Sequence, residues 1–179
     1  RSTAEGTLYR IDLRLRPEGK AGPLARSLES CENYYAQYGQ TWERMMLLKA
    51  RPVAGDAELG AEFLEIIQTF RYPRSLGVGL LREMADMKAR TEREVVRAGE
   101  LDRNVKLGRG GIREIEFVAQ ALQVLNAGSN PFLQTSHTLE ALPKLAGYQL
   151  LPGRAVVDLT RAYPFLRDVE HRLQMEEQR

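Results

Sequence analysis

The pattern of apolar and polar positions divides the chain into a short alternating segment and a long helical part. Residues 8–16 alternate strictly, and the apolar side chains on one face are Tyr9, Ile11, Leu13 and Leu15. Such alternation is typical of a half-buried strand, and Pro17 ends it because proline cannot donate a ladder hydrogen bond. No second convincing strand follows. Because one strand cannot satisfy its own backbone groups, we expect its partners to precede Arg1.

The remainder has apolar residues at the three- and four-residue spacing of helices. It predicts helices over residues 28–38 and 41–51, from Asp56 to Pro73, from Ser75 to Gly99, and over 112–126, 138–146 and 154–177. The segment 112–126 is apolar on two sides, which is typical of a central helix. Pro143 is expected to interrupt the sixth helix, and Pro164 predicts a kink or two abutting helices in the last. The expected fold class is mainly α, a helical bundle attached to the end of a β-containing domain.

Composition narrows the class of protein. Apolar residues make up 43% of the 179 residues and charged residues 28%, as in an ordinary globular chain. There is no eighteen-residue apolar run that would span a membrane. The net charge of +2 argues against a nucleic-acid-binding protein. The lone Cys31 fits a reducing, cytoplasmic location, and the first residue, an arginine without a signal peptide, leads us to expect a piece of a larger protein.

Asp12 is the first candidate for chemistry. It lies in the middle of the alternating segment, with Arg10, Arg14 and Arg16 on the same face. A carboxylate on a strand is a common ligand of Mg²⁺, and arginines bind phosphate through forked donors. The alternative is a solvent-facing strand on which Asp12 pairs with basic groups across the sheet, and the pattern alone favours this simpler interpretation.

A glycine-rich basic segment precedes the helix at 112–126. The segment Lys106–Phe117 reads KLGRGGIREIEF, and four basic residues with no acidic one lie between Arg103 and Arg113. Backbone N–H groups at Gly110 and Gly111, with Lys106, are therefore a candidate phosphate cradle. The alternative is a flexible loop with a glycine junction, because the segment is neither a P-loop nor a dinucleotide fingerprint.

Other chemistry-bearing residues favour structural roles. Glu114 and Glu116 are two apart on a helix and point to different sides, so one is expected to serve the basic segment as a structural partner. The aromatic stretch 33–42 is open to stacking on adenine, although core packing is the commoner use of such residues. Both histidines, His137 and His171, are expected to be caps or surface residues.

Taken in order along the chain, these segments resemble a known family. They are YRIDLRLRP at 9–17, GPL at 22–24, Tyr35, Trp42-Glu-Arg, Lys49-Ala-Arg, and KLGRGGIREIEF at 106–117. Together they are similar to the glutamine-synthetase adenylyltransferase/adenylyl-removing enzymes, over nearly the whole chain.

The resemblance implies a fold, an activity and a set of partners. It implies that residues 1–26 end a nucleotidyltransferase domain of the polymerase-beta type and that 27–179 form a helical bundle domain. The family attaches AMP from ATP to a tyrosine of glutamine synthetase, and removes it with phosphate to release ADP. The form of the segment 106–117 looks more like the adenylyl-removing half. Asp12 matches the family's third metal carboxylate, whose two companions lie upstream, in a site for two Mg²⁺.

The electrostatic argument adds Arg14, Arg16, Lys106, Gly110 and Gly111 as phosphate-binding groups. Under an alternative hypothesis the chain is a non-catalytic helical module that binds glutamine synthetase or a PII-type regulatory protein. In either case the chain by itself is expected to be inactive.

Overall fold

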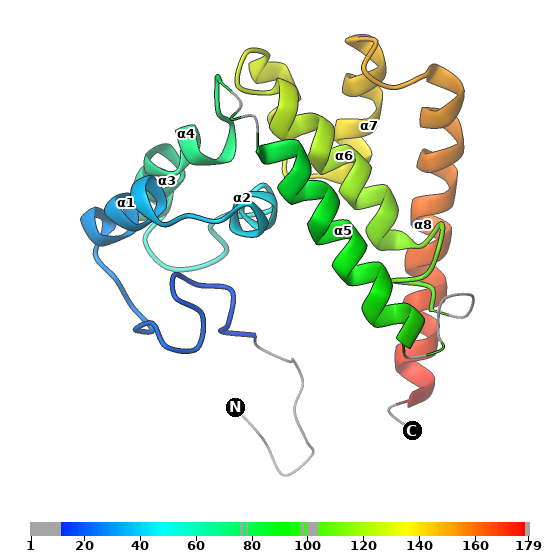
Figure 1. Ribbon diagram of the computed structural model, residues 1–179, viewed down its shortest axis with the longest axis horizontal. Helices are drawn as coiled ribbons and strands as arrows, with labels where there is room; N and C mark the ends of the chain where they lie inside the picture. The colour runs from blue at the N-terminus through cyan, green and yellow to red at the C-terminus, as the bar shows by residue number, and fades with distance from the viewer. Residues whose placement is uncertain (1–11, 76, 78, 98, 100–103, 178–179) are drawn as a thin grey trace.

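The computed structural model is built from helices (Figure 1). It describes residues 12–75, 77, 79–97, 99 and 104–177. Within these ranges the helices are α1 Leu28–Gln37, α2 Thr41–Leu47, α3 Ala57–Ile66, α4 Gln68–Arg71, α5 Leu80–Arg97, α6 Ile112–Asn126, the 3₁₀ turn η1 Pro131–Leu133, α7 Thr138–Gly147 and α8 Gly153–Glu177. The expectation of a mainly helical bundle is confirmed.

Local signals in the sequence set several of the helix starts. The carboxylate of Asp56 accepts hydrogen bonds from the N–H groups of Glu58 and Leu59, at 2.8 and 3.1 Å, and so caps α3. At α2, Gln40 and Glu43 form a reciprocal capping box. These caps satisfy first-turn donors that would otherwise lack partners.

The described residues have two apolar cores, one in each half. The α1–α4 unit packs around Tyr35, Leu47, Ile67 and Phe70. The α5–α8 bundle packs around a longer set of aliphatic side chains, among them Ile115, Leu133, Leu142 and Leu145. The short helix α2 contributes to both, because its Leu47 lies in the first core while its Met45, with the next residue Leu48, lies in the bundle core. In Figure 1 α2 accordingly lies between α1, α3 and α4 on one side and α5 on the other.

The central position expected for α6 is confirmed. It contacts α2, α7 and α8, and Ile112, Ile115, Ala119 and Val124 are buried along it. Its length therefore runs through the bundle core, and its N-terminal turn carries the glycine segment.

The expected strand is wrong for the described part of residues 8–16. Residues 12–16 form turns and bends, and no strand occurs in the parts of the chain that the structure describes; residues 8–11 lie outside them. The polar groups here are satisfied locally, because Arg14 N–H donates to Asp12 Oδ1 at 3.0 Å and Gly19 N–H donates to Arg16 O at 2.8 Å. With no described strand alongside, an extended ladder has no partner, and turns satisfy the backbone instead. The division at residue 26 stays a prediction.

The two prolines lie within continuous helices. Pro143 does not interrupt α7, so that expectation is wrong. Since α8 runs through Pro164, two abutting helices are excluded there, and the kink stays a prediction. Tyr163 and Leu166 pack against the bundle core on either side of Pro164. This packing holds both halves of α8 in place despite the hydrogen bond that proline removes.

No helix within the described residues is both long and apolar enough to cross a membrane.

Candidate functional site: the glycine loop and the α2–α6 cleft

Residues 104–111, here called the glycine loop, cap the N-terminus of α6 with their own backbone. The N–H groups of Ile112 and Arg113 donate to the carbonyls of Val105 and Lys106, at 3.1 and 3.0 Å. Asn104 Oδ1 accepts from the N–H groups of Lys106 and Leu107. First-turn donors of a helix are the groups that bind anions at such sites, and here the loop itself occupies them.

Each of the two adjacent glycines has a steric reason to be glycine. Gly110 has a φ of 68°, in the left-handed region that costs other residues energy. A Cβ at Gly111 would lie 2.7 Å from the carbonyl oxygen of Val105 and 2.8 Å from that of Gly108. The Gly-Gly pair is thus explained by the path of the loop, and its phosphate-binding role stays a prediction.

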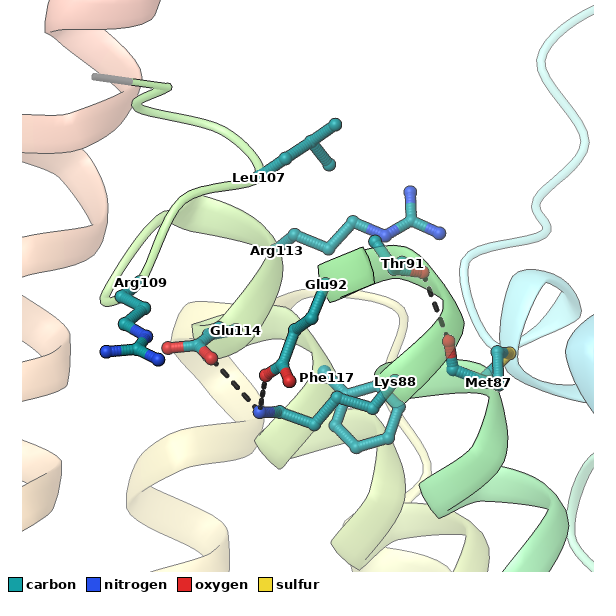
Figure 2. Close-up of a pocket in the computed structure, with 9 residues that line it drawn as sticks. All are labelled: Met87, Lys88, Thr91, Glu92, Leu107, Arg109, Arg113, Glu114 and Phe117. Carbon is teal, nitrogen blue, oxygen red and sulfur yellow. Dashed lines mark hydrogen bonds and ion pairs between the residues drawn. The ribbon is translucent and has the colours of Figure 1, made fainter. Parts of the chain in front are cut away.

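Glu114 is the carboxylate that the loop binds. Its Oε2 accepts the N–H of Gly110 at 2.8 Å, and its Oε1 forms an ion pair with Lys88 Nζ of α5 at 3.1 Å. Figure 2 shows Lys88 between Glu114 and Glu92, with Arg109 on the other side of Glu114. The Gly110 hydrogen bond, followed by Lys88, lowers the pKa of Glu114 below its ordinary value. The expectation that one glutamate of this helix serves the loop as a structural partner is confirmed.

Lys106 ties the loop to α8. Its Nζ lies 3.3 Å from Oε1 of Glu170 on α8, and Arg167 binds Oε2 of the same carboxylate at 2.7 Å. Glu170 is buried. The charge of Lys106 is therefore met by a carboxylate in this structure, and its phosphate-binding role also stays a prediction.

Glu116 faces a different neighbourhood from Glu114, as the two-residue spacing predicts. The hydroxyl of Tyr163 donates to Glu116 Oε1 at 2.7 Å, and Lys49 Nζ lies 3.3 Å from the same oxygen. Lys49 also donates to Thr138 Oγ1 at 2.7 Å. Burial, followed by the contact with Glu116, raises the pKa of Tyr163. This network joins α6 to α7, to α8 and to the chain just after α2.

The predicted metal ligand Asp12 is held by its neighbour. Arg14 Nε donates to Asp12 Oδ1 at 2.8 Å, and its Nη2 lies 2.5 Å from Oδ2. The guanidinium of Arg16 donates to the carbonyls of Gly22 and Pro23 in the adjoining turn. In Figure 1 this segment and the glycine loop lie on opposite sides of α5, although Leu15 of the segment and Arg113, just after the loop, line one cleft.

Asp12 is the only carboxylate of the predicted magnesium site that lies among the described residues. Within them no group of three or more His, Cys, Asp and Glu side chains is arranged to hold a metal ion. Asp12 supplies a single carboxylate, and Arg14 neutralises its charge. Its role as a metal ligand stays a prediction, and no chemical step is assigned to a metal here.

A cleft lies between the α1–α4 unit and the bundle, and we call it the α2–α6 cleft. Its lining residues come from the turn before α1, from α2 and the turn that follows it, and from α5 and α6: Leu15, Trp42, Met45, Met46, Lys49, Met87, Arg113, Glu116, Phe117 and Gln120. Sequence reasoning missed Arg113 as a site residue. The pattern presents it only as one of four cations, and nothing in that pattern shows that its side chain lines a cleft.

The aromatic stretch divides between core and cleft. Tyr35 is buried, with its ring 5.1 Å from that of Phe70, which confirms core packing for this residue. Trp42 is 42% exposed and lines the cleft. His137 is the residue before α7 and makes no side-chain cap hydrogen bond, and His171 is exposed.

Comparison with known proteins supports the class that the sequence pattern predicts. A family model described as glutamate-ammonia ligase adenylyltransferase matches residues 1–66, and one described as GlnD PII-uridylyltransferase matches residues 81–179. Both descriptions name nucleotidyltransferases, and the second match covers more than half of the chain.

Curated relatives then give the particular family. Bifunctional glutamine synthetase adenylyltransferase/adenylyl-removing enzymes from Thioalkalivibrio sulfidiphilus and Nitrosococcus oceani are 47% and 44% identical over 97% and 96% of this chain. The corresponding enzyme of Pseudomonas aeruginosa is 41% identical over 96% of it. The chain belongs to this family. It spans 17–18% of the length of these relatives.

Proposed function

We propose that the chain is part of a bifunctional nucleotidyltransferase that controls glutamine synthetase, and that it belongs to the adenylyl-removing half. The observation that carries the proposal is the identity of 41–47% with such enzymes over nearly the whole chain. The KLGRGGIREIEF form of residues 106–117 supports the assignment to the removing half.

The reaction of that half is in-line displacement at phosphorus. An oxygen of inorganic phosphate attacks the phosphorus of AMP-tyrosine, the bond from phosphorus to the phenolic oxygen breaks, and ADP and tyrosine form. A proton returns to the tyrosine oxygen. The described residues make up only part of the predicted active site, since they contain one predicted catalytic carboxylate and no group of side chains arranged to hold a metal ion.

The test compares this chain with a longer protein that contains it. With adenylylated glutamine synthetase and phosphate, the longer protein should release ADP, and the 179-residue chain alone should not. Asp12→Asn in the longer protein should abolish release and leave its circular dichroism unchanged, because an amide cannot supply the charge of a metal carboxylate. A matched control is Asp158→Asn on α8, which should retain activity. ADP release by the isolated chain, or full activity of Asp12→Asn, contradicts the proposal.

A second candidate function is binding without catalysis. The match of residues 81–179 to a PII-uridylyltransferase model favours a PII-type regulatory protein as one partner, with glutamine synthetase as the other. Titration of the isolated chain with each protein in a calorimeter tests this. Binding of either protein by a chain that has no activity supports the second function. Absence of binding heat in both titrations contradicts it.

A further inference from the structure

The α2–α6 cleft combines an apolar wall with one positive charge that has no partner among the described residues. Six of its lining side chains are apolar, and they are Leu15, Trp42, Met45, Met46, Met87 and Phe117. Within the cleft, Lys49 and Glu116 neutralise each other through their 3.3 Å ion pair. Arg113 is the remaining charged lining residue, so the described lining has a net charge of +1.

The guanidinium of Arg113 has no hydrogen-bond or ion-pair partner among the described residues, whereas the nearby Lys88 and Lys106 are paired. Lys88 binds two carboxylates, Arg109 lies beside Glu114, and Lys106 binds Glu170. No hydrogen bond or ion pair joins the Arg113 side chain to any residue that the structure describes. Figure 2 shows its guanidinium pointing away from the Lys88–Glu114 pair.

The backbone at Arg113 is nevertheless held firmly. Its N–H donates to the carbonyl of Lys106, and the next residue, Glu114, is bound to Gly110 and to α5. A charged side chain on a fixed backbone is better prepared to bind a ligand, because less freedom is lost on binding. The glycine loop thus holds in place the backbone that carries the Arg113 side chain.

We propose that the α2–α6 cleft binds a small ligand that carries an aromatic ring and an anionic group, with Arg113 as the residue that binds the anion. A guanidinium donates two parallel hydrogen bonds to a phosphate or carboxylate. Trp42 and Phe117 offer aromatic faces for the ring, and three methionines adapt to its outline. The inference rests on the proposed function only for the choice of AMP as a probe.

Trp42 makes the test local, because it is the only tryptophan in the chain. The 179-residue chain is titrated with AMP and with phenyl phosphate. Each has an aromatic ring and an anionic phosphate, the first as a nucleotide and the second as a simple phenol ester. Adenosine has the ring without the anion, and inorganic phosphate has the anion without the ring. Trp42 fluorescence, corrected for absorption by the probe, and calorimetry are the two readouts.

The expected result is saturable binding of AMP, of phenyl phosphate or of both, at least about tenfold tighter than adenosine or phosphate. Arg113→Gln should weaken that binding about tenfold or more and leave adenosine unaffected. Arg113→Lys should fall between, since it keeps the charge and loses the fork. Arg172→Gln, an exposed arginine on α8, is the matched control and should bind as the unaltered chain does.

Two results overturn the inference: no saturable binding of either aromatic anion, or binding that Arg113→Gln leaves unchanged in a folded protein. Selective binding of AMP indicates a nucleotide, and selective binding of phenyl phosphate indicates an aromatic phosphate ester; both support it. If the longer protein releases no ADP but the chain still binds an aromatic anion through Arg113, the proposed function is contradicted and the inference about the cleft is not.

Discussion

The α1–α4 unit and the α5–α8 bundle achieve stability by different means. The bundle buries a continuous set of aliphatic side chains, and Leu133, Leu142 and Leu145 have no exposed surface. The smaller unit buries fewer apolar side chains beside two charged ones, Glu43 at 1% and Arg71 at 8% exposure, whereas the larger core of the bundle accompanies one buried charge, Glu170. A small core has less apolar area to remove from water, so specific polar contacts carry more of its structure.

Contacts between arginines and aromatic rings are examples of these specific polar contacts in the α1–α4 unit. Arg44 lies over the ring of Phe70, 4.8 Å from its centroid, while its Nε donates to the carbonyl of Phe70 at 2.6 Å. Burial lowers the pKa of both Arg44 and Arg71. Cations held in this way depend on fixed partners, whereas aliphatic packing tolerates changes of shape that conserve volume.

The largest expected effect is in the bundle core. Leu142→Ala should lower the free energy of unfolding by about 2–5 kcal/mol, because it leaves a cavity at a fully buried site. Because α2 belongs to both cores, the two halves should unfold together. Urea titration followed by circular dichroism and by Trp42 fluorescence should give coincident transitions. Two separate transitions would show that the halves unfold independently. The control for Leu142→Ala is Leu139→Ala, at a partly exposed site on the same helix, which should lower the free energy of unfolding by less.

A smaller effect is expected at the polar contacts of the α1–α4 unit. Glu43 accepts hydrogen bonds from the Tyr34 hydroxyl at 3.1 Å and from the Gln40 N–H at 2.9 Å. Glu43→Ala should lower stability by about 1–3 kcal/mol, because the capping box is lost and buried donors lose an acceptor. Glu65→Gln, on the exposed side of α3, is the control and should change stability by less than about 0.5 kcal/mol. Equal effects of the two changes in urea titrations would show that the buried contacts of Glu43 do not stabilise the unit.

The smallest effect concerns Glu114 at the glycine loop. Since its folded pKa is below the ordinary 4.5, its stabilising contribution is complete above the unfolded pKa and is lost as the pH falls through the folded pKa. Glu114→Gln should therefore flatten the fall in stability below about pH 4.5, by less than about 1 kcal/mol, because the side chain is partly exposed and its ion pair is screened.

Thermal unfolding between pH 3 and 7, with Glu94→Gln as the control, measures this dependence on pH. An unchanged pH profile for Glu114→Gln would show that the carboxylate does not hold the loop.

Particular residues show how far prediction from sequence reached. The cap at Asp56 and the different directions of Glu114 and Glu116 follow from rules that act within a few residues, and both are as predicted. The strand at 12–16 is wrong, because alternation reports only that one face can be buried; a ladder also needs a partner strand. The order of the motifs predicted the family correctly, since that resemblance depends on residue identities rather than on geometry.

The sequence by itself determined the helical class, most of the helix limits and the family, because periodicity, caps and residue order are properties of the chain read locally. Only the tertiary structure decided which charges are matched. Lys106 meets Glu170 from more than sixty residues away, Lys49 meets Glu116 across the two halves, and Arg113 is left facing a cleft. Charge pairing between distant segments depends on how helices pack, and no local pattern records that packing.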